Sequence, residues 1–177
     1  MTYKKIVATS PSEREESKEP LFVMLEKTTG SKSYDIIERA ILNNEYKGGV
    51  NDTSKKGGAA PIHIAILFDR LEETVLLLCI KNLDINIKYS ELSTSYDYGT
   101  PYDCAHYVNS KTNENKTDKF LKFFKQNGSI NFVEVIRQLL KKDRTKALHF
   151  LIEQHKDSKL ITSKELSELK SEFPTKF

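Results

Sequence analysis

The sequence predicts an all-α solenoid, in which helical hairpins stack side by side and a helical C-terminal cap follows the stack. Three prolines at near-equal spacing, Pro20, Pro61 and Pro101, each begin an apolar segment with helical periodicity. Proline suits the first turn of a helix, because its missing N–H and fixed φ cost nothing there. A second amphipathic stretch follows each segment, and each pair runs into a turn that ends in asparagine. A unit of two helices and a turn therefore recurs three times, as in repeat proteins.

The second helix of each unit is predicted from apolar side chains that recur at i, i+3 and i+4. These helices are expected over Tyr34 to Asn44, Leu71 to Lys81 and Asp118 to Gln126. The apolar faces that we expect in the core contain Ile36, Ile37, Ala40 and Ile41 in the first unit, Val75, Leu78 and Cys79 in the second, and Phe120, Phe123 and Phe124 in the third.

The turn that closes each unit contains glycine or asparagine, which adopt the left-handed conformation that ends a helix. The three turns are Lys47–Asn51, Asn82–Asn86 and Asn127–Asn131. The units are therefore expected to fill residues 19–131. They exceed the usual repeat length, with the excess in Thr28–Ser33, Lys88–Tyr98 and Asn109–Thr117. Long loops usually carry function or disorder.

The chain on either side of the repeats is predicted to differ from them. Residues 1–18 are polar and are expected to form a tail or a short helix. Residues 132–177 show two more amphipathic patterns, with Asp143 as the expected N-cap of the second, and then a capping box at Thr162–Glu165 before a short helix. We expect this region to form a helical pair that closes the end of the stack, followed by a capping helix.

The repeated units resemble ankyrin repeats, which combine a turn with two helices and carry a Thr-Pro-Leu-His motif. The segment Gly58-Ala-Ala-Pro-Ile-His-Ile-Ala65 is most similar, and Gly99-Thr-Pro-Tyr-Asp-Cys-Ala105 is next. In the family, the threonine and histidine of the motif tie the turn to the helix start by hydrogen bonds. Here Ala60 replaces the threonine and Asp103 replaces the histidine. The resemblance therefore implies that each repeat keeps only part of this network.

Composition limits the classes of function. The chain has 177 residues, 38% of them hydrophobic, and a formal net charge of +3 with acids and bases interspersed, which does not indicate nucleic-acid binding. It contains no apolar run of the roughly 20 residues that span a bilayer. Neither a phosphate-binding loop nor metal-ligand spacing is present, so we expect no cofactor and no metal. Two cysteines in apolar patterns favour reduced thiols and the cytoplasm, or a host cytosol for an exported effector.

The resemblance implies a non-catalytic module that binds another protein through its turns and through the concave face of its first helices. The residues expected to contact a partner are Lys55, Lys56, Phe68, Asp69, Tyr89, Tyr96, Asp97, Tyr98 and Tyr107. Tyrosine is enriched at interface hot spots, because it combines apolar area with a hydroxyl group. The alternative for these rings is that some of them pack back on the stack.

Two other functions remain open from the sequence. An exported bacterial effector could bind a host protein through its C-terminal helices, residues 132–172, with the repeats as a scaffold. A cysteine-dependent enzyme could use Cys104 and His106, although a core position for the cysteine fits the helical pattern better. Asn86 lies in a segment that resembles the ankyrin pattern modified by asparaginyl hydroxylases, so hydroxylation of this residue is a further hypothesis.

Overall fold

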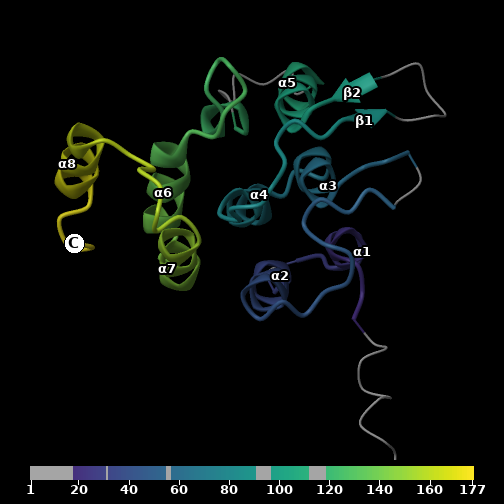
Figure 1. Ribbon diagram of the computed structural model, residues 1–177, viewed down its shortest axis with the longest axis horizontal. Coiled ribbons are helices and arrows are strands. Elements are labelled where there is room, and N and C mark those ends of the chain that lie inside the picture. Colours follow the sequence, from purple (N-terminus) through teal and green to yellow (C-terminus); the bar gives the residue numbers. More distant parts are fainter. Residues whose placement is uncertain (1–17, 31, 55–56, 91–96, 112–118) are drawn as a thin grey trace, which may run out of the picture.

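The computed structural model describes residues 18–30, 32–54, 57–90, 97–111 and 119–177. The described chain is helical apart from one short hairpin, which confirms the all-α prediction in its coarse form (Figure 1). The elements, in chain order, are α1 (Leu21–Lys27), α2 (Ser33–Leu42), α3 (Pro61–Leu67), α4 (Leu71–Leu78), β1 (Tyr89–Ser90), β2 (Asp97–Gly99), α5 (Pro101–Lys111), the 3₁₀ helix η2 (Leu121–Phe123), α6 (Phe132–Lys141), α7 (Thr145–Gln154) and α8 (Ser163–Glu172).

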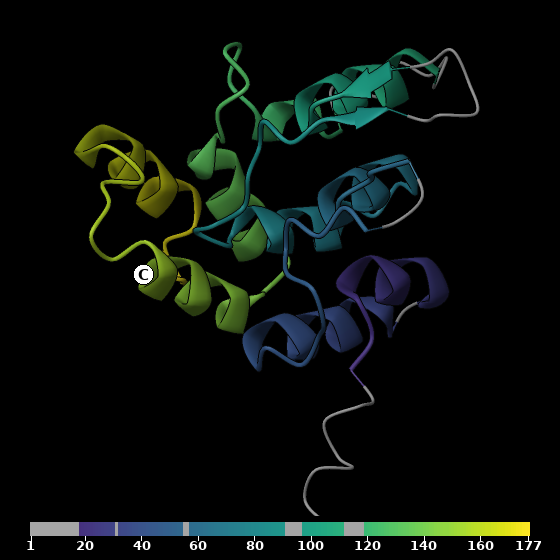
Figure 2. The ribbon, with the colours of Figure 1, turned by 45° about the vertical axis from the view of Figure 1, so that its right-hand side comes forward.

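The helices form layers that follow their order in the chain. The first-helix layer consists of α1, α3 and α5, which pack side by side, and the second-helix layer contains α2 and α4. The chain then reverses direction, because α6 packs beside α4 and α7 beside α2 (Figure 2). We call α6 and α7 the third layer. Helix α8 lies outside it, against α6.

The position of the third layer differs from the expectation that residues 132–177 close the end of the stack. The reason lies in α4, where every residue from Glu73 to Leu78 is buried. A helix that is buried around its whole circumference needs neighbours on all sides. Helices α3 and α2 supply two of them, and α6 supplies another through Val135 and Leu139, which are 0% and 2% exposed. The C-terminal pair therefore covers the side of the stack.

The third unit also departs from the prediction, because the helix expected over Asp118 to Gln126 is only the single 3₁₀ turn of η2. The chain is already extended at Phe124, which forms an antiparallel bridge with Ile130. Lys125 N–H donates to the Ser129 carbonyl at 2.7 Å, so a tight turn replaces the rest of the helix. The three expected core phenylalanines, Phe120, Phe123 and Phe124, are nevertheless buried.

Both proline-started helices α3 and α5 are tied at their start by a side chain of their first turn. The Ala60 N–H donates to His63 Nδ1 at 3.1 Å, and the Thr100 N–H donates to Asp103 Oδ2 at 2.8 Å. The Thr100 hydroxyl also donates to Asp103 Oδ2, at 2.7 Å. Asp103 therefore makes the backbone bond that His63 makes in the preceding unit. The expectation that Asp103 leaves the network of its repeat incomplete was therefore wrong for this bond, whereas Ala60 has no hydroxyl with which to make the threonine bond.

The turns between units are joined by Asn51. Its side-chain amide donates to the Asn82 carbonyl at 2.7 Å, and its Oδ1 accepts the Asp84 N–H at 2.9 Å. One side chain thus holds the turn after α2 against the turn after α4. None of the helices in the described ranges is long and apolar enough to cross a bilayer.

Candidate functional site

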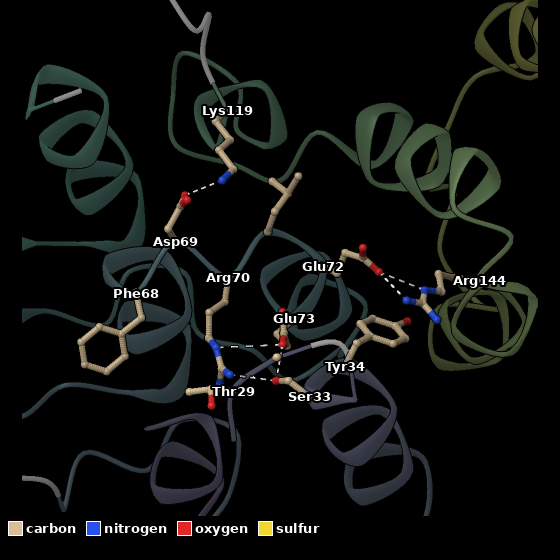
Figure 3. Close-up of a pocket in the computed structure, with 12 residues that line it drawn as sticks. Thr29, Ser33, Tyr34, Phe68, Asp69, Arg70, Glu72, Glu73, Lys119 and Arg144 are labelled. Carbon is tan, nitrogen blue, oxygen red and sulfur yellow. Dashed lines mark hydrogen bonds and ion pairs between the residues drawn. The ribbon is translucent and has the colours of Figure 1, made fainter. Parts of the chain in front are cut away.

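A groove runs along the edge where the helices turn within their hairpins (Figure 3). We call it the turn groove, and its volume is about 460 Å³. It collects side chains from three turns and from the segment before η2. The lining residues are Thr29, Gly30, Ser33, Tyr34, Phe68, Asp69, Arg70, Leu71, Glu72, Glu73, Lys119 and Arg144.

A buried charged network forms the floor of the turn groove at the α3–α4 turn. Arg70 donates to the backbone carbonyls of Leu25 and Thr28, where α1 ends, and to Ser33 Oγ at 2.8 Å. The Ser33 hydroxyl donates to Glu73 Oε1 at 2.7 Å, and Arg70 Nε lies 4.0 Å from the same oxygen. The side chains of Arg70 and Glu73 are only 11% and 9% exposed. This network therefore fixes the first hairpin to the second.

Next to this floor, Phe68 and Asp69 project from the end of α3. Asp69 has a left-handed backbone, with φ of 60°, and its Oδ1 lies 2.5 Å from Lys119 Nζ. Phe68 is 56% exposed, which is unusual for a large apolar side chain beside a polar groove. The structure thus brings together two residues that were expected to contact a partner, at the hairpin edge.

Arg144, from the α6–α7 turn, forms the opposite wall of the groove. Its guanidinium lies 3.7 Å from the centre of the Tyr34 ring and donates to Glu72 Oε2 at 2.6 and 3.0 Å. Burial raises the pKa of the Glu72 carboxyl, but the hydrogen bonds and charge of Arg144 outweigh it, so the pKa lies below its ordinary value. Burial and the neighbouring Glu38 carboxylate raise the pKa of the Tyr34 hydroxyl. This wall ties the third layer to both α2 and α4.

The groove is suited to contact, because its charges are already held in place by internal pairs. Neither cysteine nor histidine is among the described residues that line it. Rigid side chains lose little conformational freedom when a partner binds them. The arrangement therefore offers a preorganised polar groove beside the exposed ring of Phe68.

Tyr89 does not lie on an exposed surface, contrary to expectation. It is 8% exposed, and its ring centroid is 5.6 Å from that of His63. The β1–β2 hairpin, which occupies the segment expected to be a loop, pairs Tyr89 with Gly99 and turns the ring inward. Burial lowers the pKa of His63 to about 4, although its ring faces the backbone carbonyls of Ile87 and Gly99. Tyr89 therefore belongs to the core beneath the hairpin.

The other predicted partner residues are not brought into the groove. Tyr107 is half-buried on α5 and does not line it. Lys55, Lys56 and Tyr96 lie outside the described residues, as do the side chains of Asp97 and Tyr98 in β2. Asn86 is exposed in its turn, and its N–H donates to Asp84 Oδ1 at 2.9 Å.

The cysteines lie in the core. Cys104 is 0% exposed, whereas His106 is exposed and packs edge-on against Tyr102 at 4.6 Å. The Cys79 thiol donates to the Val75 carbonyl at 3.2 Å, and burial raises its pKa. Within the described ranges, no group of three or more acidic, histidine or cysteine side chains is arranged to hold a metal ion.

Sequence reasoning missed the charged residues of the groove, Arg70, Glu72, Glu73, Lys119 and Arg144. One signal was present, because the dipeptide Asp-Arg occurs at 69–70 and again at 143–144, each time between two amphipathic helices. Comparison of the chain with protein-family models, with curated proteins and with solved structures finds no match.

Proposed function

We propose that the chain is a divergent ankyrin-type solenoid that acts as a non-catalytic binding module for another protein. Three features support the ankyrin assignment. First and second helices occupy separate layers, His63 and Asp103 make equivalent bonds at the start of α3 and α5, and Asn51 joins consecutive turns. Because both cysteines are buried and neither forms a disulfide, we also propose the cytoplasm, or a host cytosol after export, as the place of action.

The observation that carries the binding proposal is the exposed ring of Phe68 beside the turn groove. The third layer covers the second-helix side of the stack, so that side is already used within the chain. Interface hot spots combine an aromatic anchor with a surrounding rim that excludes water. Phe68 supplies an aromatic anchor, with the charged Asp69 and Lys119 on its side of the groove and Arg144 on the opposite wall. We therefore propose that the partner contacts the turn groove.

The proposal can be tested with a photo-reactive benzoylphenylalanine placed at position 68 or at position 152. Phe68 and Ile152 are matched in exposure, at 56% and 51%, but lie on α3 and α7. After irradiation in cell extract, we expect a discrete cross-linked product from position 68. Adding Lys119→Glu should reduce that product, because it reverses a charge on the Phe68 side of the groove. Equal products from both positions, or none from position 68, would contradict the proposal.

A second candidate function is binding through the C-terminal helices. The exposed Ile152 on α7 favours it, since large apolar side chains on a surface often mark contact sites. A product from position 152 alone would support this candidate and would assign the repeats to a scaffold role.

A further inference from the structure

Within helix α8, one side chain is fully buried against the rest of the molecule. Leu169 is its buried residue, at 0% exposure, and the other α8 side chains are half-buried or exposed. Glu172 Oε2 accepts a hydrogen bond from Arg137 Nε at 2.7 Å, and its Oε1 lies 3.6 Å from Lys141 Nζ. Leu169 and Glu172 are three residues apart and therefore share one face of the helix. Within α8, the attachment is made by Leu169 and Glu172. The segments beside the helix add to it, because Leu160, Ile161 and Phe173 pack partly buried against the core and Lys176 pairs with Asp143.

The third layer does not need α8 to fill its inner side. Val135 and Leu139 of α6 and Leu151 of α7 are 0–2% exposed, and they belong to the continuous core of the molecule. Helix α8 also carries its own start signal, because the Thr162 N–H donates to Glu165 Oε2 and the Glu165 N–H donates to Thr162 Oγ1. The segment between α7 and the cap, residues 156–161, is exposed or half-buried. Displacing α8 therefore exposes Leu169 and the partly buried residues beside the helix, but it does not open the inner side of the third layer.

The face of α6 that α8 covers has a defined chemistry. Arg137 and Lys141 lie one helical turn apart, and Val133 and Leu140 share their face by the same spacing. Arg137 bonds both Glu134 and Glu172, and its side chain is 20% exposed. An apolar surface that a leucine side chain can contact thus lies next to the cationic groups of Arg137 and Lys141. An amphipathic helix with a leucine and a following acid matches this arrangement.

We propose that this face of α6 is a binding site for an amphipathic helix of a partner protein, in which a glutamate follows a leucine by three residues, and that α8 is its intramolecular occupant. Tethering gives α8 a high effective concentration. A partner helix with additional apolar residues on the same face displaces it. The site is separate from the turn groove, so its test is independent of the proposed function above.

The test uses a fluorescent peptide of residues 159–177 as the probe and full-length chains as receptors. In the double variant Leu169→Ser/Glu172→Ser, the chain's own α8 no longer competes while α6 is unchanged. We expect the peptide to bind this variant at least ten times more tightly than the wild type. Adding Arg137→Ser should weaken binding at least tenfold. Raising the salt from about 0.05 to 0.5 M should weaken it several-fold, because exposed ion pairs are screened.

Matched controls separate the site from nonspecific contact. The variant Lys164→Ser changes a charged residue of α8 whose side chain is 87% exposed and which pairs with Glu168 on its own helix, so it should leave peptide binding at the wild-type level. A peptide with Leu169→Ser should not bind any of the chains. The proposal is overturned if the double variant keeps its melting temperature and does not bind the peptide, or if it binds no better than the wild type.

Two further measurements cover the remaining outcomes. If the double variant unfolds, native-state hydrogen exchange on the wild type tests the proposal instead. The backbone amides of a displaceable α8 should exchange at least 100 times faster than those of α6. Equal exchange rates would overturn the proposal. If sedimentation shows that the wild type forms a concentration-dependent dimer that exchanges α8, the occupant is a second copy of the chain, and the partner proposal fails.

Discussion

The α3–α4 turn and the α6–α7 turn have the same backbone conformation but differ in how deeply their side chains are buried. In each, an aspartate adopts a left-handed conformation, with φ of 60° at Asp69 and 54° at Asp143, and an arginine follows it. The Arg70 N–H donates to the Ala65 carbonyl at 2.8 Å, and the Arg144 N–H donates to the Leu139 carbonyl at 2.9 Å. The two turns therefore share one local backbone solution.

The two arginines differ in what they reach. The Arg70 side chain is 11% exposed and bonds backbone carbonyls and buried polar groups of the neighbouring hairpin. Arg144 is 29% exposed and crosses between layers to Glu72 and Tyr34. One turn geometry thus supports two kinds of connection, which we call joints. Arg70 makes a buried joint within the stack, and Arg144 makes a half-exposed joint between layers. The free energy of unfolding should therefore depend far more on the buried joint than on the half-exposed joint.

The largest expected effect is that of Arg70→Met. Removing the cation leaves the buried Glu73 carboxylate with the Ser33 hydroxyl but without a positive charge, and it removes the Arg70 hydrogen bonds to two backbone carbonyls. Breaking a buried pair from one side typically costs about 3–5 kcal/mol. Urea denaturation should show this loss in the free energy of unfolding. The double variant Arg70→Met/Glu73→Gln should recover part of it, and a loss below about 1 kcal/mol would show that the network is not essential to the stack.

Acidification gives the next largest effect, because His63 is buried within the stack. Its pKa is about 4 in the folded chain and about 6.5 when unfolded, so the unfolded state binds more protons between these values. The contribution of neutral His63 to the free energy of unfolding is fully present above pH 6.5 and is lost as pH falls toward 4. The loss is roughly 3 kcal/mol, since one pKa unit is worth about 1.4 kcal/mol.

The contribution of His63 can be isolated by measuring urea midpoints at pH 7 and pH 4.5 for the wild type and for His63→Gln. The variant should lose less stability on acidification, although it is less stable at pH 7. His155 in the third layer also has a pKa lowered by burial, so His155→Gln serves as the comparison. If His155→Gln changed the pH dependence more than His63→Gln, acid would act mainly on the third layer.

The two joints also show how far sequence reasoning reaches. The helices begun by Pro61 and Pro101 were predicted correctly, because proline and apolar periodicity are local signals. The pairing of Arg144 with Glu72 joins residues 72 positions apart, and no local pattern specifies such a pair. The prediction that Asp143 is an N-cap was wrong, since Arg144 holds that position. The apolar run from Thr74 to Cys79 did carry a usable signal, because such a helix needs a neighbour on every side.

A smaller effect is expected for Arg144→Gln. The variant loses a charge-assisted bond to Glu72 and the contact with the Tyr34 ring, which together contribute about 1–2 kcal/mol at this partly exposed site. The loss should shrink in high salt, unlike that of Arg70→Met. Lys142→Gln is the matched control, because Lys142 lies 3.5 Å from Glu72 and is half-exposed. If Arg144→Gln lowered the free energy of unfolding as much as Arg70→Met does, the two joints would contribute equally to stability.

The smallest effect concerns the backbone that the two turns share. At Asp69 and at Asp143, the alanine variant should be less stable than the glycine variant by about 1 kcal/mol, because alanine resists a left-handed φ and glycine does not. Each aspartate also pairs with a lysine, Lys119 or Lys176, but both substitutions remove that pair, so it cancels in the difference. Thermal unfolding of the four variants should therefore give the same alanine–glycine gap in both turns. Unequal gaps would mean that the surroundings, and not only the side-chain contacts, set the conformation of each turn.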